Sequence, residues 1–135
     1  MSAQRLPDWR ERLAAFVLAR RAVPFAWADN NCVLIAADAV AAIAGADIAA
    51  PLRGFAPSRF GALLRLRRLG FSSVAEFFDA HFPRVSYARP GDLVCLDDGP
   101  LNTTLIADGR GAGWGASATG LMRVALPAQA LAWGV

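Results

Sequence analysis

Cys32 is the residue of this sequence best placed for covalent chemistry. It follows the polar stretch Asp29-Asn30-Asn31 and opens an almost uniformly apolar run that ends at Ala44. A thiol in the first turn of a helix meets unpaired backbone N–H groups and the positive end of the helix dipole, which favour the thiolate. The position indicates a nucleophile, while the simpler interpretation is a buried cysteine that acts as a small apolar side chain.

A cysteine nucleophile also needs a base within hydrogen-bond reach, and the leaving group later needs a proton. His81 is the one histidine of the chain, and it follows Asp79-Ala80 near the expected end of a helix. A histidine at that place usually interacts with the C-terminus of its helix. We therefore expect a structural role for His81 and keep it as an alternative base for Cys32.

Other chemistry is poorly supported by the residue types. Two cysteines and one histidine are too few for an ordinary zinc site, so we expect neither metal nor cofactor. Cys95 lies between Val94 and Leu96 in a strand pattern, which predicts a core position. The glycine-rich stretch 109–115 lacks the Lys-Ser/Thr pair of a phosphate loop. We interpret it as a flexible loop that displays Trp114 to another protein.

Length and charge narrow the classes of protein further. With 135 residues, one domain over 1–135 is expected. The net charge is +3, and all fourteen basic residues are arginine. Only Arg65, Arg67 and Arg68 form a cluster, which we interpret as the solvated face of a helix. We therefore expect no nucleic-acid partner. No apolar run is long enough for a membrane span, and the first residues lack a signal peptide, so folding in the cytoplasm is expected.

The elements that must position Cys32 are helices first and strands second. Capping residues and apolar spacing predict four helices. The first runs from Asp8, a cap with Glu11 in the reciprocal position, to residue 22, and the second covers 32–44 after a cap at Asn30 or Asn31. The third runs from Ser58 to residue 69, and the fourth from Ser73 towards Pro83. Strands are predicted over 92–96, 101–107, 110–114 and 121–125, with a loop over 115–120 and a short helical turn after Pro127. Helices followed by an antiparallel meander predict an α+β fold.

The sequence also carries a family resemblance. Pro90-Gly91-Asp92-Leu93-Val94, well after the cysteine helix, resembles the strand start of the NlpC family of papain-like cell-wall cysteine peptidases. Small NlpC-related proteins of phage and prophage tail modules are more similar still. Their pattern is matched at Trp27, at Cys32, at Ala37-Asp38, at Gly45-Ala46-Asp47 and at Leu52-Arg53-Gly54. The resemblance implies a papain-like α+β fold with Cys32 at the nucleophile position, and Asp92 fixing the start of the strand.

The departures from that family concern proton transfer. Asn30 and Asn31 stand in place of a His-Asp pair, and the strand histidine falls on Asn102, or on Leu101 if the register shifts. Asparagine cannot carry a proton in either direction. The resemblance therefore implies a structural tail-tip or baseplate component of the virion, assembled in the host cytoplasm and contacting tail hub proteins. The alternatives are an active cysteine hydrolase that cuts peptidoglycan peptide bonds during DNA entry, and a scaffold that binds cell-wall peptide without cutting it.

Overall fold

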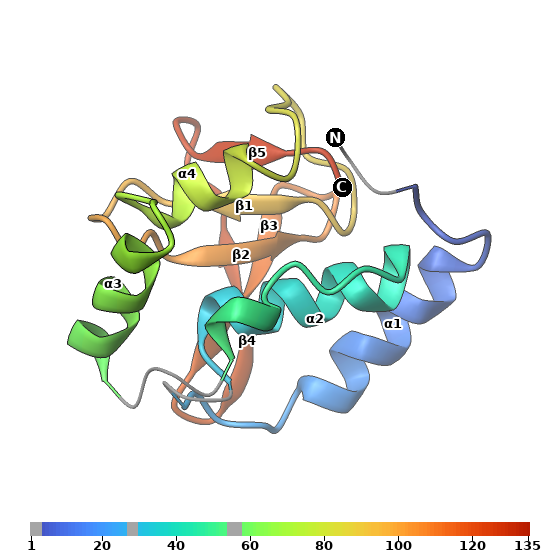
Figure 1. The fold of residues 1–135 in the computed structure, drawn as a ribbon. Coiled ribbons are helices and arrows are strands. Elements are labelled where there is room, and N and C mark those ends of the chain that lie inside the picture. Colours follow the sequence, from blue (N-terminus) through green and yellow to red (C-terminus); the bar gives the residue numbers. More distant parts are fainter. Residues whose placement is uncertain (1–3, 27–29, 54–57) are drawn as a thin grey trace.

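The first half of the chain is helical, as the sequence predicts. The computed structural model describes residues 4–26, 30–53 and 58–135 (Figure 1). The helices are α1 (Trp9–Arg20), α2 (Cys32–Ala44), the short 3-10 helix η1 (Ala50–Leu52), α3 (Arg59–Arg68) and α4 (Val74–Asp79). Trp27 and Gly54, which contribute to the family resemblance, lie outside the described residues, as does Asp29 of the polar stretch before Cys32.

The second half forms one antiparallel sheet. Its strands are β1 (Leu93–Cys95), β2 (Thr104–Ala107), β3 (Ala112–Ser117), β4 (Gly120–Ala125) and β5 (Leu131–Trp133). They lie in the order β4-β3-β2-β1-β5, so the last strand in sequence pairs with the first. Helices followed by an antiparallel sheet confirm the predicted α+β class.

Capping explains why α2 begins and ends where it does. The Asn31 side chain accepts a hydrogen bond from the Leu34 backbone N–H at 2.9 Å, and Gly45 ends the helix in the left-handed conformation at φ 76°. Ser58 and Ser73 cap α3 and α4 in the same way. Asp8 is the N-cap residue of α1, as predicted, but its carboxylate accepts a hydrogen bond from Arg12 at 2.8 Å and caps no backbone N–H.

Two predictions for the sheet are wrong. Residues 115–120 are not a loop, since β3 continues to Ser117 and turns directly into β4. Trp114 lies within β3, paired with Ile106 and Arg123, and is not displayed on a flexible loop. Glycine fits this strand because a Cβ at Gly115 would stand 2.5 Å from Leu105 Cδ2. The helical turn predicted after Pro127 is a plain turn that leads into β5.

The α2 helix is the centre of the core. It packs against α1 on one side and against the sheet, mainly β2, on the other (Figure 1). Val40 and Ile43 are fully buried, and they join Leu93, Ile106 and Trp133 of the sheet in one apolar cluster. A smaller cluster around Val94 and Leu105 covers the opposite face of the sheet. Burial on all sides accounts for the almost uniformly apolar sequence of α2.

Asp92 ties both ends of the described chain to the start of β1. Its carboxylate is 1% exposed and accepts hydrogen bonds from Arg5 Nη2 at 2.7 Å, from the Arg89 N–H at 2.8 Å and from the Val135 N–H at 3.0 Å. Burial lowers the pKa of the Arg5 guanidinium, and the Asp92 carboxylate opposes that shift. The structural role predicted for Asp92 is confirmed.

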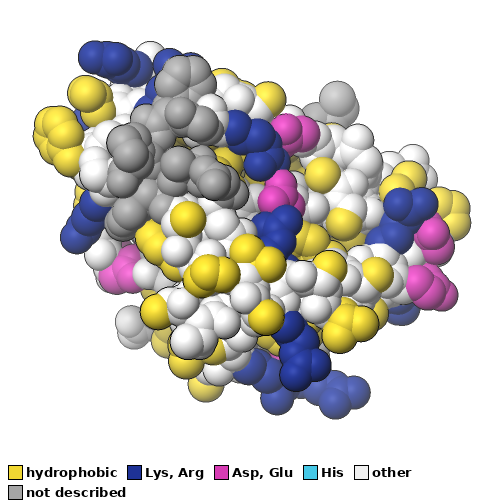
Figure 2. Space-filling view, turned by 90° about the horizontal axis from the view of Figure 1, so that it is seen from below, with side chains coloured by type: hydrophobic (Ala, Val, Ile, Leu, Met, Phe, Trp, Pro, Cys, Tyr) yellow, Lys and Arg dark blue, Asp and Glu magenta, His cyan; other side chains and the backbone are white. Residues whose placement is uncertain are grey.

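A second ionic cluster joins α1 and α2 to the segment before α3. Asp38 accepts a hydrogen bond from Arg20 at 2.7 Å and another from Arg53 at 2.6 Å, and Arg53 also binds Asp47. These ion pairs are partly exposed and individually weak, but they share partners and so fix three segments together. On the face shown in Figure 2, basic and acidic side chains lie next to one another among scattered hydrophobic ones.

Replacing Asp92 by Asn should destabilise the fold strongly. The change leaves the nearly buried Arg5 guanidinium without its carboxylate, and breaking such a pair typically costs about 3–5 kcal/mol. Urea unfolding measures the loss. Asp8→Asn is the matched control, because it breaks the exposed Asp8–Arg12 pair and should leave the unfolding midpoint in place. Equal midpoints for the two variants would contradict the role given to Asp92.

Ile43→Ala tests the position of α2 in the core. Ile43 is fully buried, so the truncation removes apolar contacts and leaves a cavity that should cost about 2–5 kcal/mol. Leu18→Ala on α1 removes a side chain that is 67% exposed and should change the unfolding free energy by less than about 0.5 kcal/mol. A small effect of Ile43→Ala in denaturant unfolding would show that α2 is not the central helix.

Candidate functional site

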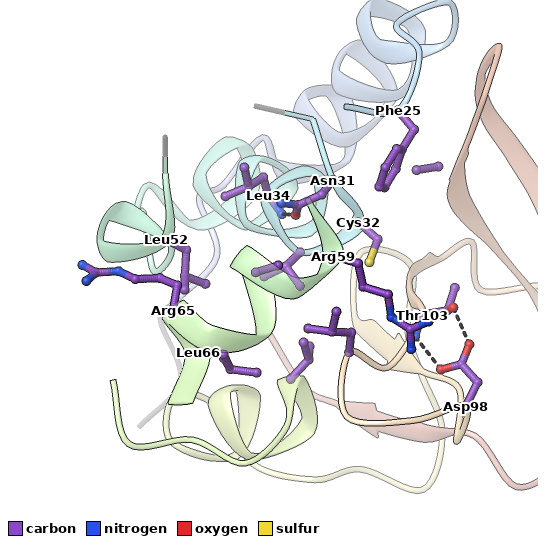
Figure 3. Close-up of a pocket in the computed structure, with 15 residues that line it drawn as sticks. Phe25, Asn31, Cys32, Leu34, Leu52, Arg59, Arg65, Leu66, Asp98 and Thr103 are labelled. Atoms are coloured by element: carbon purple, nitrogen blue, oxygen red, sulfur yellow. Dashed lines mark hydrogen bonds between the residues drawn. The ribbon is translucent and has the colours of Figure 1, made fainter. Parts of the chain in front are cut away.

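A cavity of about 370 Å³ opens at the N-terminus of α2. Its walls come from the first turn of α2, from one face of α3 and from the loop between β1 and β2. Figure 3 shows the Cys32 sulfur and the Arg59 side chain pointing into this space. The remaining lining is mostly apolar: Phe25, Val33, Leu34, Leu52, Ala62, Leu66, Val74, Leu101 and Ala116, with Asn31, Arg65, Asp98 and Thr103. The cavity is therefore an apolar pocket with a few polar groups, the usual composition of a ligand site.

Cys32 is the first residue of α2, as predicted, and is half-buried. Burial raises the pKa of its thiol, and hydrogen bonds from Thr104 and from the Val33 backbone only partly offset the rise. The helix N-terminus was expected to favour the thiolate. Desolvation outweighs that effect here, so the sulfur is a neutral thiol near neutral pH.

Thr104 is the side chain that the structure brings to Cys32. It is buried, and its hydroxyl also lies 3.4 Å from the sulfur of Cys95, its partner in the β1–β2 register. Burial raises the pKa of Cys95 to about 12, in keeping with the core position predicted for it. Sequence reasoning missed Thr104 because it placed the start of the strand at Leu101, whereas β2 starts at Thr104. The hydroxyl of threonine offers hydrogen bonds but no basic nitrogen.

Asn102 has a structural task away from the cavity. Its Oδ1 accepts a hydrogen bond from the Ala75 backbone N–H at 3.1 Å, and its Nδ2 donates to the Leu96 carbonyl at 3.0 Å. The side chain therefore joins the β1–β2 loop to the first turn of α4. Among the described residues Asn102 makes no hydrogen bond to Cys32, and it does not line the cavity.

Asn30 also has a structural role, because its side chain holds the loop before α2 in place. Its side chain is buried, accepts a hydrogen bond from Arg20 at 2.9 Å and donates to the Pro24 carbonyl at 2.7 Å. Asn31 lines the cavity but uses its Oδ1 as the cap of α2. The two residues that replace the expected His-Asp pair thus hold the chain that leads into Cys32.

His81 does not line the cavity. Its ring packs against Phe77 with the ring centroids 4.8 Å apart, and burial lowers its pKa. The lowered pKa favours the neutral imidazole, so the main contact of His81 is the packing of its ring on Phe77 and not a charge interaction with the C-terminus of α4. The structure therefore separates the alternative base from the pocket that contains Cys32.

Arg59 is the charged residue that sequence reasoning did not single out. It is exposed at the start of α3, and its side chain points towards Asp98 and Thr103 (Figure 3). Asp98 is already engaged, because it accepts hydrogen bonds from the Thr103 N–H at 2.8 Å and from the Thr103 hydroxyl. Arg59 makes no ion pair with any described carboxylate. Its guanidinium is a donor for a carboxylate or another anion that enters the pocket.

Over 4–26, 30–53 and 58–135, no three His, Cys, Asp or Glu side chains come together as metal ligands would. Among the same residues, no helix is both long enough and apolar enough to cross a bilayer.

Alkylation of Cys32 should respond to pH as a buried thiol does. In a Cys95→Ser background, the rate with iodoacetamide should keep rising above pH 9.0, the ordinary value for a thiol, because the pKa of Cys32 is raised. Thr104→Val removes a hydrogen bond that lowers the pKa and should move the profile further upwards. A rate that levels off below pH 8 would indicate a stabilised thiolate and contradict the raised pKa of Cys32.

The comparisons with known proteins place the chain in a family but attach no activity to it. The DUF6950 domain, described as a domain of unknown function, matches residues 4–135 and so covers all but the first three residues. No curated protein and no solved structure gives a significant match. The chain therefore belongs to the DUF6950 family.

Proposed function

We propose that this protein is a non-hydrolytic structural component of a phage or prophage tail tip, built on a degenerate NlpC-like, papain-type domain. The observation that carries the proposal is the surroundings of Cys32. The residue opens the central helix and faces the sheet, as a papain-like nucleophile does, but its thiol meets Thr104 and no imidazole.

The order and packing of the elements support the domain assignment. The cysteine helix comes first and packs against an antiparallel sheet that begins just after Asp92. Residues that carry the resemblance also have defined tasks: Asp38, Asp47 and Arg53 form one ionic cluster, and Asp92 holds the start of β1. A lineage can retain such residues for the fold after the catalytic base has been replaced.

The chemistry of the pocket argues against the hydrolase alternative. A neutral thiol attacks an amide poorly, and neither Thr104 nor Asn102 can take its proton or return one to a leaving amine. Loss of a general acid–base typically costs about a hundred- to ten-thousand-fold in rate. The tail-tip location in the virion, the assembly in the host cytoplasm and the hub or baseplate partners follow from the family resemblance.

Binding of cell-wall peptide without cleavage is the second candidate. It is favoured by Arg59, which stands exposed at the pocket without a carboxylate partner among the described residues. Stem peptides of the cell wall carry carboxylates that a guanidinium can bind. Titration calorimetry with soluble muropeptides, compared between the wild type and Arg59→Ala, tests it. Heat that is lost in the variant supports this candidate, and equal heat in both proteins opposes it.

Purified protein should leave muropeptides intact. Mass spectrometry of the incubated mixture is expected to give the same product profile for the wild type and for Cys32→Ala, because Cys32 lacks a base. An active NlpC-family enzyme serves as the positive control for the substrate. Cleavage by the wild type that disappears in Cys32→Ala would overturn the structural assignment and favour the hydrolase.

Complementation separates an assembly role from a catalytic one. In a host whose tail module lacks this gene, Cys32→Ala should restore infectious particles about as well as the wild type, and the protein should be detected on purified tails. Asp92→Ala should fail, because it removes the carboxylate that holds the fold. Normal particles in the absence of the protein, or failure of a folded Cys32→Ala variant, would contradict the proposed function.

A further inference from the structure

A second hollow lies between α1 and Trp114 of β3, and it shares no lining residue with the thiol pocket. It has a volume of about 450 Å³ and is almost entirely apolar. One face of α1 forms its floor, and Pro90 and Trp114 form the opposite wall. The residues of α1 and its C-cap residue contribute at helical intervals: Trp9, Arg10, Leu13, Ala14, Val17 and Leu18 from the helix, and Arg21 directly after it. We refer to these nine residues as the α1 groove.

Several large apolar side chains of the groove are only partly covered by the fold. Leu18 is 67% exposed, and Trp9, Val17 and Trp114 are half-buried. Trp9 is held in place, since the guanidinium carbons of Arg5 and Arg10 lie 4.2 and 4.4 Å from its ring centroid. A rigid aromatic ring beside exposed aliphatic groups is typical of the centre of an interface.

The charge of the groove has one sign. Arg10 and Arg21 are its charged residues, and no carboxylate lines it. Among the described residues neither guanidinium has a carboxylate partner, whereas Arg12 on the same helix is paired with Asp8. Guanidinium groups at the rim of an apolar groove select partners with acidic side chains next to apolar anchors.

We propose that the α1 groove is the docking site for an acidic, amphipathic segment of a partner protein, which inserts apolar side chains between α1 and Trp114. The inference does not depend on the tail-tip assignment, because it follows from the groove alone. A helix with apolar residues at intervals of three and four would match the spacing along α1.

The test uses a synthetic helical peptide of about 18 residues with leucine on one face and glutamate on the other. Binding to the full chain is measured by fluorescence anisotropy of the labelled peptide. A matched peptide with lysine in place of glutamate should bind at least about tenfold more weakly. The double change Arg10→Glu with Arg21→Glu should weaken binding of the acidic peptide by about tenfold or more.

The control variant carries the same change of charge elsewhere. Arg67→Glu with Arg68→Glu alters two exposed arginines of α3 and should change the affinity by less than about twofold. Leu18→Asp introduces a like charge into the groove and should weaken binding while circular dichroism stays that of the wild type. Equal affinity for the acidic and basic peptides, or an equal loss in the control variant, would overturn the proposal.

Two other occupants would also overturn it. Sedimentation of the wild type as a dimer that Leu18→Asp dissociates would assign the groove to a second copy of the chain. Binding of the protein to vesicles of anionic phospholipid, lost with the Arg10 and Arg21 changes and kept with the Arg67 and Arg68 changes, would assign it to a membrane surface. The proposal is supported if the protein is a monomer, does not bind these vesicles and binds the acidic peptide.

Discussion

A single buried carboxylate sets the geometry on which the rest of the molecule depends. Asp92 must be paired because an isolated charge in the interior is costly, and its partners come from residues far apart in the sequence: Arg5, Arg89 and Val135. Its backbone carbonyl also accepts the Ala107 N–H at 2.8 Å, at the end of β2. The position of β1 against β2 is thereby fixed, and with it the register that sets Thr104 opposite Cys95 and beside Cys32.

The thiol pocket shows two opposing effects at a helix N-terminus. The dipole and the free N–H groups of the first turn favour a charged sulfur, and burial disfavours it. Burial prevails at Cys32, since its partners are one hydroxyl and backbone groups, and no cation is among the causes of its shift. A cysteine at the start of a helix is therefore not evidence of a nucleophile by itself. Whether such a cysteine can react also depends on the side chain that the neighbouring strand places beside it, which here is Thr104 of β2.

The helices were more predictable than the strands, for identifiable reasons. Asn31 and Gly45 are local signals, so the ends of α2 could be read directly. β3 was obscured because Gly115 resembles a loop residue, although it is needed under Leu105. The site was only half predictable: Cys32 follows from its helix, whereas Thr104 depends on a strand register that no local pattern encodes. The spacing of four residues between Phe77 and His81 agrees with their ring contact, but no local pattern indicated that His81 lies outside the pocket.

The place of β5 in the sheet has a consequence for how the protein is made. β1 pairs with β2 on one side and with β5 on the other, and β5 is separated from it in sequence by all of β2, β3 and β4. During synthesis, the edge of β1 that pairs with β5 has no partner strand until Leu131–Trp133 have left the ribosome. Leu93 and Val94 lie on this strand. Unpaired apolar strand edges are sites of intermolecular association. The yield of native protein therefore depends on the interval between translation of β1 and arrival of β5.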